Sequence, residues 1–181
     1  MGYGVVEDRR GKLVHVGHGV IKADGSAPLH ERLHAIFGEL TLALSLYKPD
    51  AVAVEGVFTF RNARSALVLG HARGVALLVA AQRGLPIHEY APAKVKRAVG
   101  AGGADGKDAV ARMVQTFLGV EISERADASD ALAVAICHLN HGRVPMGSVK
   151  AQGTSKKRGK GAFAQLADRL VPSYRRVGNG G

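Results

Sequence analysis

Three carboxylates in two separate stretches of the sequence have the types and spacing of a metal-dependent hydrolytic site. Glu55 directly follows the apolar run 51–54, which is typical of a strand buried on both faces. Ligand and catalytic groups in α/β sheets lie outside the carboxyl ends of such strands. Asp127 and Asp130 lie three residues apart at the start of a predicted helix, so both occupy one face within a turn. If this helix packs across the end of the strand, the three carboxylates converge.

Converging carboxylates raise one another's pKa unless a cation lies among them. Oxygen-only ligands select Mg²⁺, with Mn²⁺ as a substitute, and paired ions of this kind activate water and stabilise the leaving oxygen in phosphodiester cleavage. The sequence therefore indicates a two-ion site for phosphodiester hydrolysis. Simpler interpretations stay open at two positions, because Glu55 can turn to solvent at its strand end and Asp127 can cap its helix.

The elements that must position these side chains follow from hydrophobic periodicity. Segments 3–7 and 13–22 are predicted to form an antiparallel hairpin with a turn at 9–11, and an amphipathic helix of about five turns starts after Pro28. The following elements are predicted to be a strand at 51–55, a helix at 62–82, a strand at 87–91, and helices at 93–99, 107–118 and 128–139. This order predicts an α/β fold, a mixed β-sheet with helices on both faces.

The charge of the chain points to a polyanionic partner. The 181 residues carry a formal net charge of +10, which favours nucleic acid over an acidic membrane surface. Residues 148–181 contain eight Lys or Arg and one Asp, in a polar, glycine-rich segment without periodicity. We therefore expect a nuclease domain at 1–143 and a basic, disordered tail at 144–181, with a short helix at 162–171 and a weak electrostatic role.

The cysteines, histidines and apolar runs of the sequence limit the kinds of site and the cellular location that we expect. Cys137 is the only cysteine, which excludes a disulfide framework and a cysteine zinc site. The N-terminus lacks a signal core, and the longest apolar runs fall short of the ~20 residues that cross a bilayer. We therefore expect a cytoplasmic protein with no membrane association. The eight histidines show no ligand spacing, and we interpret His138 and His141 as ordinary residues at a helix end.

Two long motifs resemble those of the RuvC family, the bacterial Holliday-junction resolvases. They are AVAVEGVFTFRNARSALVLGHARGV at 51–75 and ADASDALAVA at 126–135, and GYGVV at 2–6 is similar to the family's second strand. The resemblance covers about residues 2–142. It implies a ribonuclease-H-like fold and a homodimer that nicks a four-way DNA junction symmetrically. Partnership with the branch-migration proteins RuvA and RuvB is implied by the resemblance alone.

The resemblance also implies catalytic roles for single residues. Glu55, Asp127 and Asp130 match the family's metal-binding catalytic carboxylates. Lys96 and Lys107 match functional lysines near the scissile phosphate. A lysine beside a flexible glycine-rich loop, such as Lys107, can contact a DNA phosphate or stabilise charge in the transition state.

Further residues are candidates for DNA contact. Phe58 matches the aromatic residue that inserts at the junction centre, and stacking on an unpaired base is worth roughly 1–3 kcal/mol. Arg61, Arg64 and Arg73 are candidate phosphate contacts. Scattered arginines on a helix are also common on a solvated face, so the structural interpretation stays open for these three.

The chain departs from the family at its start. Family members begin with a strand of the form Ile-Leu-Gly-Ile-Asp-Pro-Gly, and this chain opens at the later Gly-Tyr-Gly. We therefore expect the natural protein to begin about fourteen residues upstream, because without that central strand the sheet has two unpaired edges. The chain as given would lack one catalytic Asp, fold poorly and have little or no nuclease activity.

Two other functions stay open. One is a cleavage-inactive protein that holds DNA junctions through Phe58, the lysines and the tail. The other is a ribonuclease-H-like nuclease that acts on RNA. Cleavage of a four-way junction, a linear duplex and a structured RNA discriminates between these functions, whereas salt dependence does not, because salt weakens all of these complexes.

Overall fold

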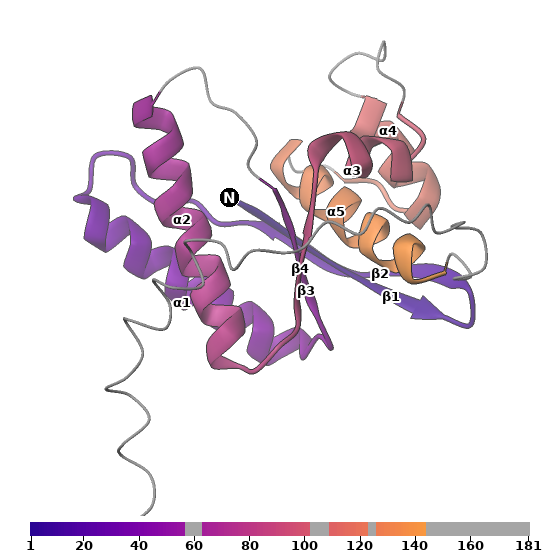
Figure 1. The fold of residues 1–181 in the computed structure, drawn as a ribbon, viewed down its shortest axis with the longest axis horizontal. Coiled ribbons are helices and arrows are strands. Elements are labelled where there is room, and N and C mark those ends of the chain that lie inside the picture. The colour runs from indigo at the N-terminus through magenta and orange to yellow at the C-terminus, as the bar shows by residue number, and fades with distance from the viewer. Residues whose placement is uncertain (57–62, 102–108, 123–125, 144–181) are drawn as a thin grey trace, which may run out of the picture. The chain divides into compact units, whose positions relative to one another are not determined.

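The computed structural model describes most of the first of two compact units, Met1–Pro145 and Met146–Gly181 (Figure 1). The described residues are 1–56, 63–101, 109–122 and 126–143.

An antiparallel hairpin opens the fold, as the alternation of the sequence predicts. Strand β1 (Gly2–Arg9) pairs with β2 (Lys12–Val20). Arg10 and Gly11 form the two-residue turn, and both have positive φ, 54° and 89°. Two positive φ values give a turn whose twist matches that of the flanking strands.

An irregularity in the hairpin brings two histidines together. The pairing register shifts between Val5 and Val6, which is the signature of a β-bulge. His15 and His18 are three residues apart in β2, yet His15 Nε2 lies 2.8 Å from His18 Nδ1. The bulge adds one residue and thereby places both rings on the same face, which the spacing of the histidines alone did not predict.

A parallel strand pair follows, with a crossover helix between its strands. Lys48, with a φ of 45°, caps the end of helix α1 (Leu29–Tyr47), and its backbone N–H donates a hydrogen bond to the carbonyl oxygen of Leu44. Strand β3 (Val52–Glu55) then pairs in parallel with β4 (Ile87–Tyr90), and α2 (Ala63–Gln82) connects them. These bounds agree with the predicted elements to within one or two residues.

The core is built around the last helix of the described unit. Helices α3 (Pro92–Ala98) and α4 (Ala109–Leu118) pack on α5 (Ala126–Arg143). The fully buried side chains of α5 are those of Ala128, Leu132, Ala133, Ile136 and Cys137. A single core cluster joins them to residues of β2, β4, α3 and α4.

Glycines let α5 approach the backbone of β1 closely. A Cβ atom added at Gly4 would lie 2.6 Å from Leu132 Cγ, and one added at Gly2 would overlap the backbone at Asp127. Helix α5 therefore packs directly on the strand backbone. This close packing fixes the first turn of α5, which carries Asp127, relative to the start of β1.

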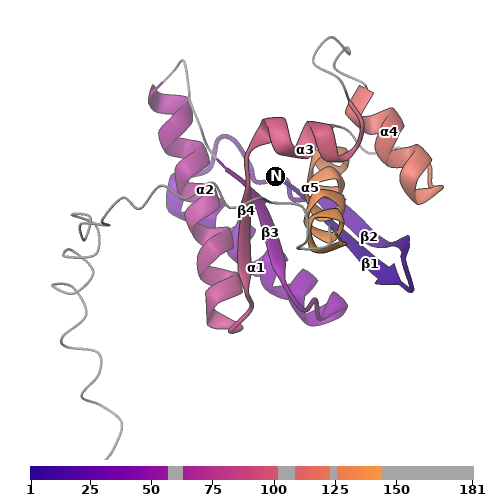
Figure 2. The same ribbon diagram turned by 45° about the vertical axis from the view of Figure 1, so that its right-hand side comes forward.

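The predicted α/β fold with helices on both faces is confirmed. Helices α1 and α2 lie on one side of the strands, and α3, α4 and α5 lie on the other (Figures 1 and 2). Within the described residues the strands form two small sheets, the antiparallel hairpin and the parallel β3–β4 pair. Both kinds of pairing of a mixed sheet are thus present, and β1 and β3 each pair on one edge only in this part of the chain.

Helix α2 contains an apolar segment of 18 residues, longer than the apolar runs that are evident in the sequence. Ser65–Gln82 has a mean hydropathy of 1.3, so by length and composition alone it could cross a membrane, and 11% of it is buried. Such a match is weak support for a membrane span. The same helix packs on α1 and β4 and carries Arg73, whose guanidinium binds both strands of the parallel pair.

Candidate active site

Glu55 lies at the carboxyl end of the parallel strand pair, on the face that α5 covers. It is the last residue of β3, and Tyr90 of β4 is its register partner. Side chains alternate between the faces of a strand. Ala53 packs on the core that contains α5, so Glu55, two residues later, points to the same side. This is the edge at which α/β sheets place their functional groups.

Asp127 and Asp130 lie at the start of α5, which begins at Ala126. The positive end of the helix dipole favours an acidic residue in this first turn. Serine and alanine side chains around them are buried, whereas both aspartates are accessible to solvent. The helix therefore buries its apolar side in the core and leaves its acidic side at the surface.

The electrostatics couple Glu55 to the start of α5. Burial and the nearby Asp130 raise the pKa of the Glu55 carboxyl above its ordinary value, and Lys96 acts in the opposite direction. Burial and the neighbouring Asp127 raise the pKa of Asp130, and Lys96 again opposes the shift. Lys96 belongs to α3. The structure thus brings Glu55, Asp130 and Lys96 into one electrostatic neighbourhood.

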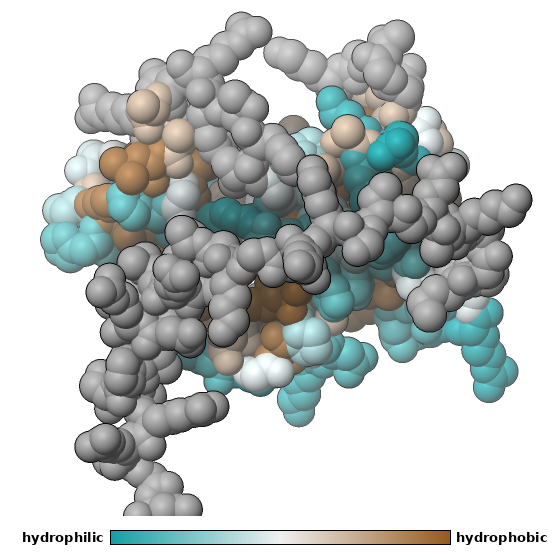
Figure 3. Space-filling model, in the orientation of Figure 1, coloured by the Kyte–Doolittle hydropathy of each residue, from teal (hydrophilic) through white to brown (hydrophobic). Residues whose placement is uncertain are grey.

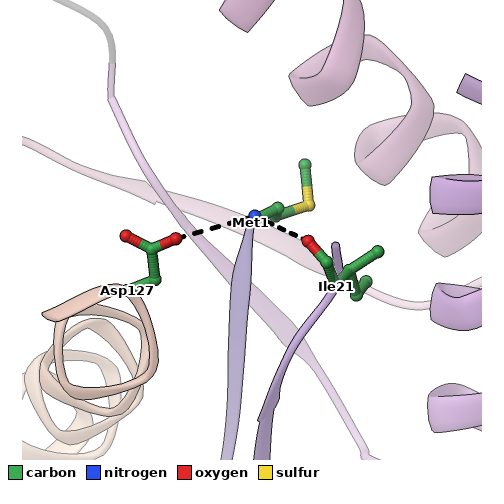
Figure 4. A network of polar contacts seen from close by, with 3 residues as sticks. All are labelled: Met1, Ile21 and Asp127. Atoms are coloured by element: carbon green, nitrogen blue, oxygen red, sulfur yellow. Dashed lines mark hydrogen bonds and ion pairs between the residues drawn. The ribbon is translucent and has the colours of Figure 1, made fainter. Parts of the chain in front are cut away.

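Asp127 is held at one side of this neighbourhood. Its side chain is 58% exposed, and its Oδ2 lies 3.7 Å from the α-amino group of Met1 (Figure 4). The same amino group donates a hydrogen bond of 3.0 Å to the carbonyl oxygen of Ile21. Within the described part of the chain, no group of three or more His, Cys, Asp or Glu side chains could hold a metal ion. The three predicted ligands are therefore coupled electrostatically as two pairs, Glu55 with Asp130 and Asp130 with Asp127.

The donor chemistry of these pairs fits a hard divalent cation. All candidate ligands are carboxylate oxygens, which suit Mg²⁺ and Mn²⁺. Burial is the main cause of the raised pKa values of Glu55 and Asp130, and a neighbouring carboxylate adds to it, Asp130 in the case of Glu55 and Asp127 in the case of Asp130. A bound cation offsets that electrostatic cost. Carboxylates with perturbed pKa values, next to the carboxyl end of a strand, are typical of functional sites.

Arg73 makes contacts that its sequence position did not reveal. Its Nη1 donates a hydrogen bond of 2.5 Å to the backbone oxygen of Glu55, and its Nη2 lies 2.8 Å from Glu89 Oε2. Its side chain is only 19% exposed. The guanidinium predicted to contact a DNA phosphate is therefore engaged with the protein itself.

Several predicted site residues lie outside the described part of the chain. These are Phe58 and Arg61 in segment 57–62, Lys107 in segment 102–108, and the basic tail. Arg64 belongs to the first turn of α2, but its side chain is not among the parts of the chain that the structure describes. The roles expected for these residues stay predictions.

Sequence reasoning missed a polar network at the other end of α5. Tyr90 Oη and His138 Nδ1 are 2.8 Å apart, and the ring of His138 stacks on that of His88 with centroids 4.5 Å apart. Lys94 Nζ lies 3.3 Å from His141 Nε2. His138 and His141 are therefore more than ordinary helix-end residues. His88 and Tyr90 are two residues apart in a predicted strand and so lie on the same face of it, and this spacing was the sequence signal for the network.

Comparisons with known proteins agree with the family resemblance. The family model described as "Crossover junction endodeoxyribonuclease RuvC" matches residues 1–138. A relative of that name from Myxococcus xanthus is 72% identical over 178 residues, 97% of this chain and 92% of the relative. The relative from Trichlorobacter lovleyi is 44% identical over 156 residues, 86% of this chain and 88% of the relative.

Solved structures give the same result for the fold. The structure titled "T. thermophilus RuvC in complex with Holliday junction substrate" is similar with a TM-score of 0.69 and 34% identity, over 78% of this chain and 87% of that chain. A second structure of Thermus thermophilus RuvC has a TM-score of 0.68 at the same identity, over 78% and 88% of the two chains. This chain belongs to the RuvC family of crossover junction endodeoxyribonucleases.

Proposed function

We propose that this chain is a divalent-metal-dependent endodeoxyribonuclease that resolves four-way DNA junctions in recombination and repair. The observation that carries the proposal is the pairing of Glu55 with Asp130 at the carboxyl end of β3, where both carboxyls have raised pKa values. The names of the relatives and the junction complex of the Thermus protein support the substrate.

The carboxylates and Lys96 divide the chemistry between them. Glu55, Asp127 and Asp130 would hold Mg²⁺, two ions in each site, with Mn²⁺ as a substitute. Such ions, when bound, lower the pKa of water and stabilise the leaving oxygen. Lys96 acts electrostatically on Glu55 and Asp130, which supports a role for its ammonium group in stabilising a phosphate. Hydrolysis adds water across one P–O bond and leaves a phosphate monoester and a hydroxyl group.

The basic and aromatic residues beyond this site would bind the junction. The net charge of +10 gives strong, salt-sensitive attraction to DNA. Phe58 would stack on an unpaired base at the junction centre, and Lys107, Arg61 and Arg64 would contact phosphates. The alignment with the Myxococcus relative spans 97% of this chain, so the shared sequence extends into the basic tail.

A homodimer would place two such sites on one junction. Large apolar side chains are exposed on the two neighbouring helices α1 and α2: Leu42, Leu46, Leu67, Leu69 and Leu78. Hydrophobic residues gather on this side of the molecule in Figure 3. Exposed apolar patches mark interaction surfaces, and a second copy of the chain is the partner that symmetric nicking requires. Size-exclusion chromatography with light scattering measures this state directly.

The cellular setting follows from the substrate. A junction-resolving enzyme acts where the bacterial chromosome lies, which is the cytoplasm. RuvA and RuvB, which drive branch migration, would deliver the junction to it.

The direct test is the substitution of Glu55. Glu55→Gln keeps the shape of the side chain and removes its charge, so in a form of the protein that cleaves junctions, cleavage in Mg²⁺ should fall by more than about 100-fold. Binding of the junction in a gel-shift assay should be retained. Cleavage by the variant at the wild-type rate would contradict the proposed role of Glu55. Linear duplex and structured RNA serve as substrate controls, and efficient cleavage of RNA would favour the alternative nuclease.

One observation favours a second candidate function. The described residues contain no group of three side chains that could hold a metal ion, which agrees with a protein that binds junctions without cutting them. A junction shift in the gel with no product in Mg²⁺ or Mn²⁺ would establish that function. Product formation by the wild-type chain would exclude it.

A further inference from the structure

We infer that Arg73 is a positioning residue for Glu55: its guanidinium joins Glu89 of β4 to the backbone carbonyl of Glu55 and thereby holds the end of β3. This inference rests on the proposed function of Glu55 as a metal-binding residue. It assigns Arg73 to the protein's own architecture, in place of the phosphate contact that the sequence suggested.

The geometry places Arg73 on the opposite face from the carboxylates. Glu89 is the register partner of Val54, one position before Glu55. Because strand faces alternate, Val54 and Glu89 point to the α2 side, whereas Glu55 points to the α5 side. Arg73 reaches from α2 to Glu89 and to the Glu55 carbonyl. It therefore contacts the backbone of Glu55 from behind and leaves the carboxylate free on the other face.

Both polar atoms of one peptide group are bonded as a result. The carbonyl of Glu55 accepts the hydrogen bond from Arg73. The N–H of Gly56, in the same peptide group, donates a hydrogen bond of 2.8 Å to the carbonyl oxygen of Tyr90. This peptide is planar, so the two bonds together fix its orientation. The fixed orientation of this peptide group restrains the backbone of Glu55 at the end of β3, immediately before segment 57–62.

The choice of arginine is explained by this arrangement. A guanidinium has several donors in a rigid plane and can bind a carbonyl and a carboxylate at once, whereas lysine presents a single flexible ammonium group. Glu89 binds one side of the guanidinium, and the Arg73 side chain is only 19% exposed to solvent. The Glu89–Arg73 pair thus forms a bridge behind the site.

The first experiment measures this bridge without substrate or metal. Amide hydrogen exchange of Gly56 is compared in the wild-type chain, Arg73→Lys, Arg73→Met and Arg83→Met. Arg83 is a matched control, because its Nη2 also binds a backbone carbonyl, that of Thr41, and Ser45 Oγ, away from the site. Both Arg73 variants should exchange Gly56 faster, by about tenfold for Arg73→Met. Unchanged exchange in Arg73→Met would overturn the inference, even if wild-type cleavage were absent.

The second experiment separates positioning from DNA binding. Arg73→Met and Arg73→Lys should lower kcat on the junction by about 10- to 100-fold, the usual effect of residues that orient metal ligands, with KM unchanged. Glu89→Ala should lower kcat in the same direction by less, and adding it to Arg73→Met should cause no further loss. A raised KM with unchanged kcat, together with a salt slope reduced by about one, would instead identify a phosphate contact and overturn the inference.

The two experiments distinguish failure of this inference from failure of the proposed function. If the wild-type chain does not cleave junctions, the proposed function fails and the exchange rates of Gly56 still decide whether the bridge exists. If wild type cleaves and Arg73→Met cleaves equally well while remaining folded, the positioning role fails and the proposed function stands.

Discussion

The two ends of α5 both place titratable side chains beside the core, but these side chains interact with their neighbours in opposite ways. At its start, burial and the neighbouring Asp127 raise the pKa of Asp130, and Asp130 in turn helps to raise the pKa of Glu55. Toward its end, His138 is hydrogen-bonded to Tyr90 and stacked on His88. One end holds carboxylates whose raised pKa values Lys96 offsets only in part, and the other holds a hydrogen-bonded network.

This difference separates a functional cluster from a structural one. A network whose members satisfy one another stabilises the fold and does not require a ligand. Partly buried carboxylates whose pKa values are raised by burial and by a neighbouring carboxylate cost stability until a cation joins them, which is typical of active sites. The start of α5 is therefore the place to expect chemistry. The histidine end is expected to join α5 to β4.

The largest expected contrast is in catalysis. Asp130→Asn should reduce junction cleavage by more than about 100-fold, because it removes a proposed metal ligand. His138→Gln should leave kcat nearly unchanged in protein that is still folded. Single-turnover cleavage of a labelled junction measures both. Equal losses in the two variants would remove the distinction between the ends of the helix.

Stability should show the reverse contrast. Tyr90→Phe deletes the hydroxyl that bonds to His138 Nδ1 and leaves that partly buried nitrogen unpaired. The free energy of unfolding should fall by about 1–3 kcal/mol, as measured by urea denaturation. Tyr47→Phe on α1 is a control for loss of a tyrosine hydroxyl elsewhere. A Tyr90→Phe protein as stable as wild type would show that this network contributes nothing.

The pH dependence should also differ between the ends. Burial, together with His88 and His141, lowers the pKa of His138 below its ordinary 6.5. The unfolded chain then takes up this proton at higher pH than the folded one, so stability should fall as pH decreases through about 6.5. His138→Gln should flatten this slope, and the exposed control His34→Gln should keep it. An unchanged slope in His138→Gln would contradict the structural role.

The smallest effect concerns the acidic end without metal. Asp130 has a raised pKa, so its stability cost is absent at low pH and develops as pH rises through and above its ordinary 3.8. Asp130→Asn should therefore stabilise the metal-free protein at neutral pH. The gain should be below about 1 kcal/mol, since the site is partly exposed and screened by solvent. Thermal unfolding in a chelating buffer checks this, and a lower Tm for the variant would contradict it.

The sequence predicted the elements well because their periodicity is local. The helix after Pro28, the strand before Glu55 and the helix that holds Asp130 all follow from patterns within about twenty residues, although this last helix spans Ala126–Arg143 and is longer than the predicted 128–139. The apolar run at 51–54 and the paired aspartates also identified the carboxylates that the structure couples electrostatically.

Contacts between distant segments could not be predicted in the same way. Arg73 binds a backbone oxygen 18 residues away and a carboxylate on another strand, and no helical pattern encodes such partners. The stacking of His88 on His138 depends on how β4 packs against α5. The pairwise relation of the three carboxylates likewise depends on tertiary geometry, because spacing alone fixes only Asp127 relative to Asp130.

The most direct test of the acidic end as a metal site is calorimetric titration with Mg²⁺ and Mn²⁺ at pH 4.5, in buffers of different ionisation enthalpy. Because the pKa of Glu55 is raised above its ordinary 4.5, more than half of this carboxyl is protonated at that pH, and metal binding should displace the proton. The wild-type and Tyr90→Phe proteins should bind with net proton release, and Asp130→Asn should lose both binding and release. Equal metal binding by wild type and Asp130→Asn, or binding by neither, would contradict the assignment.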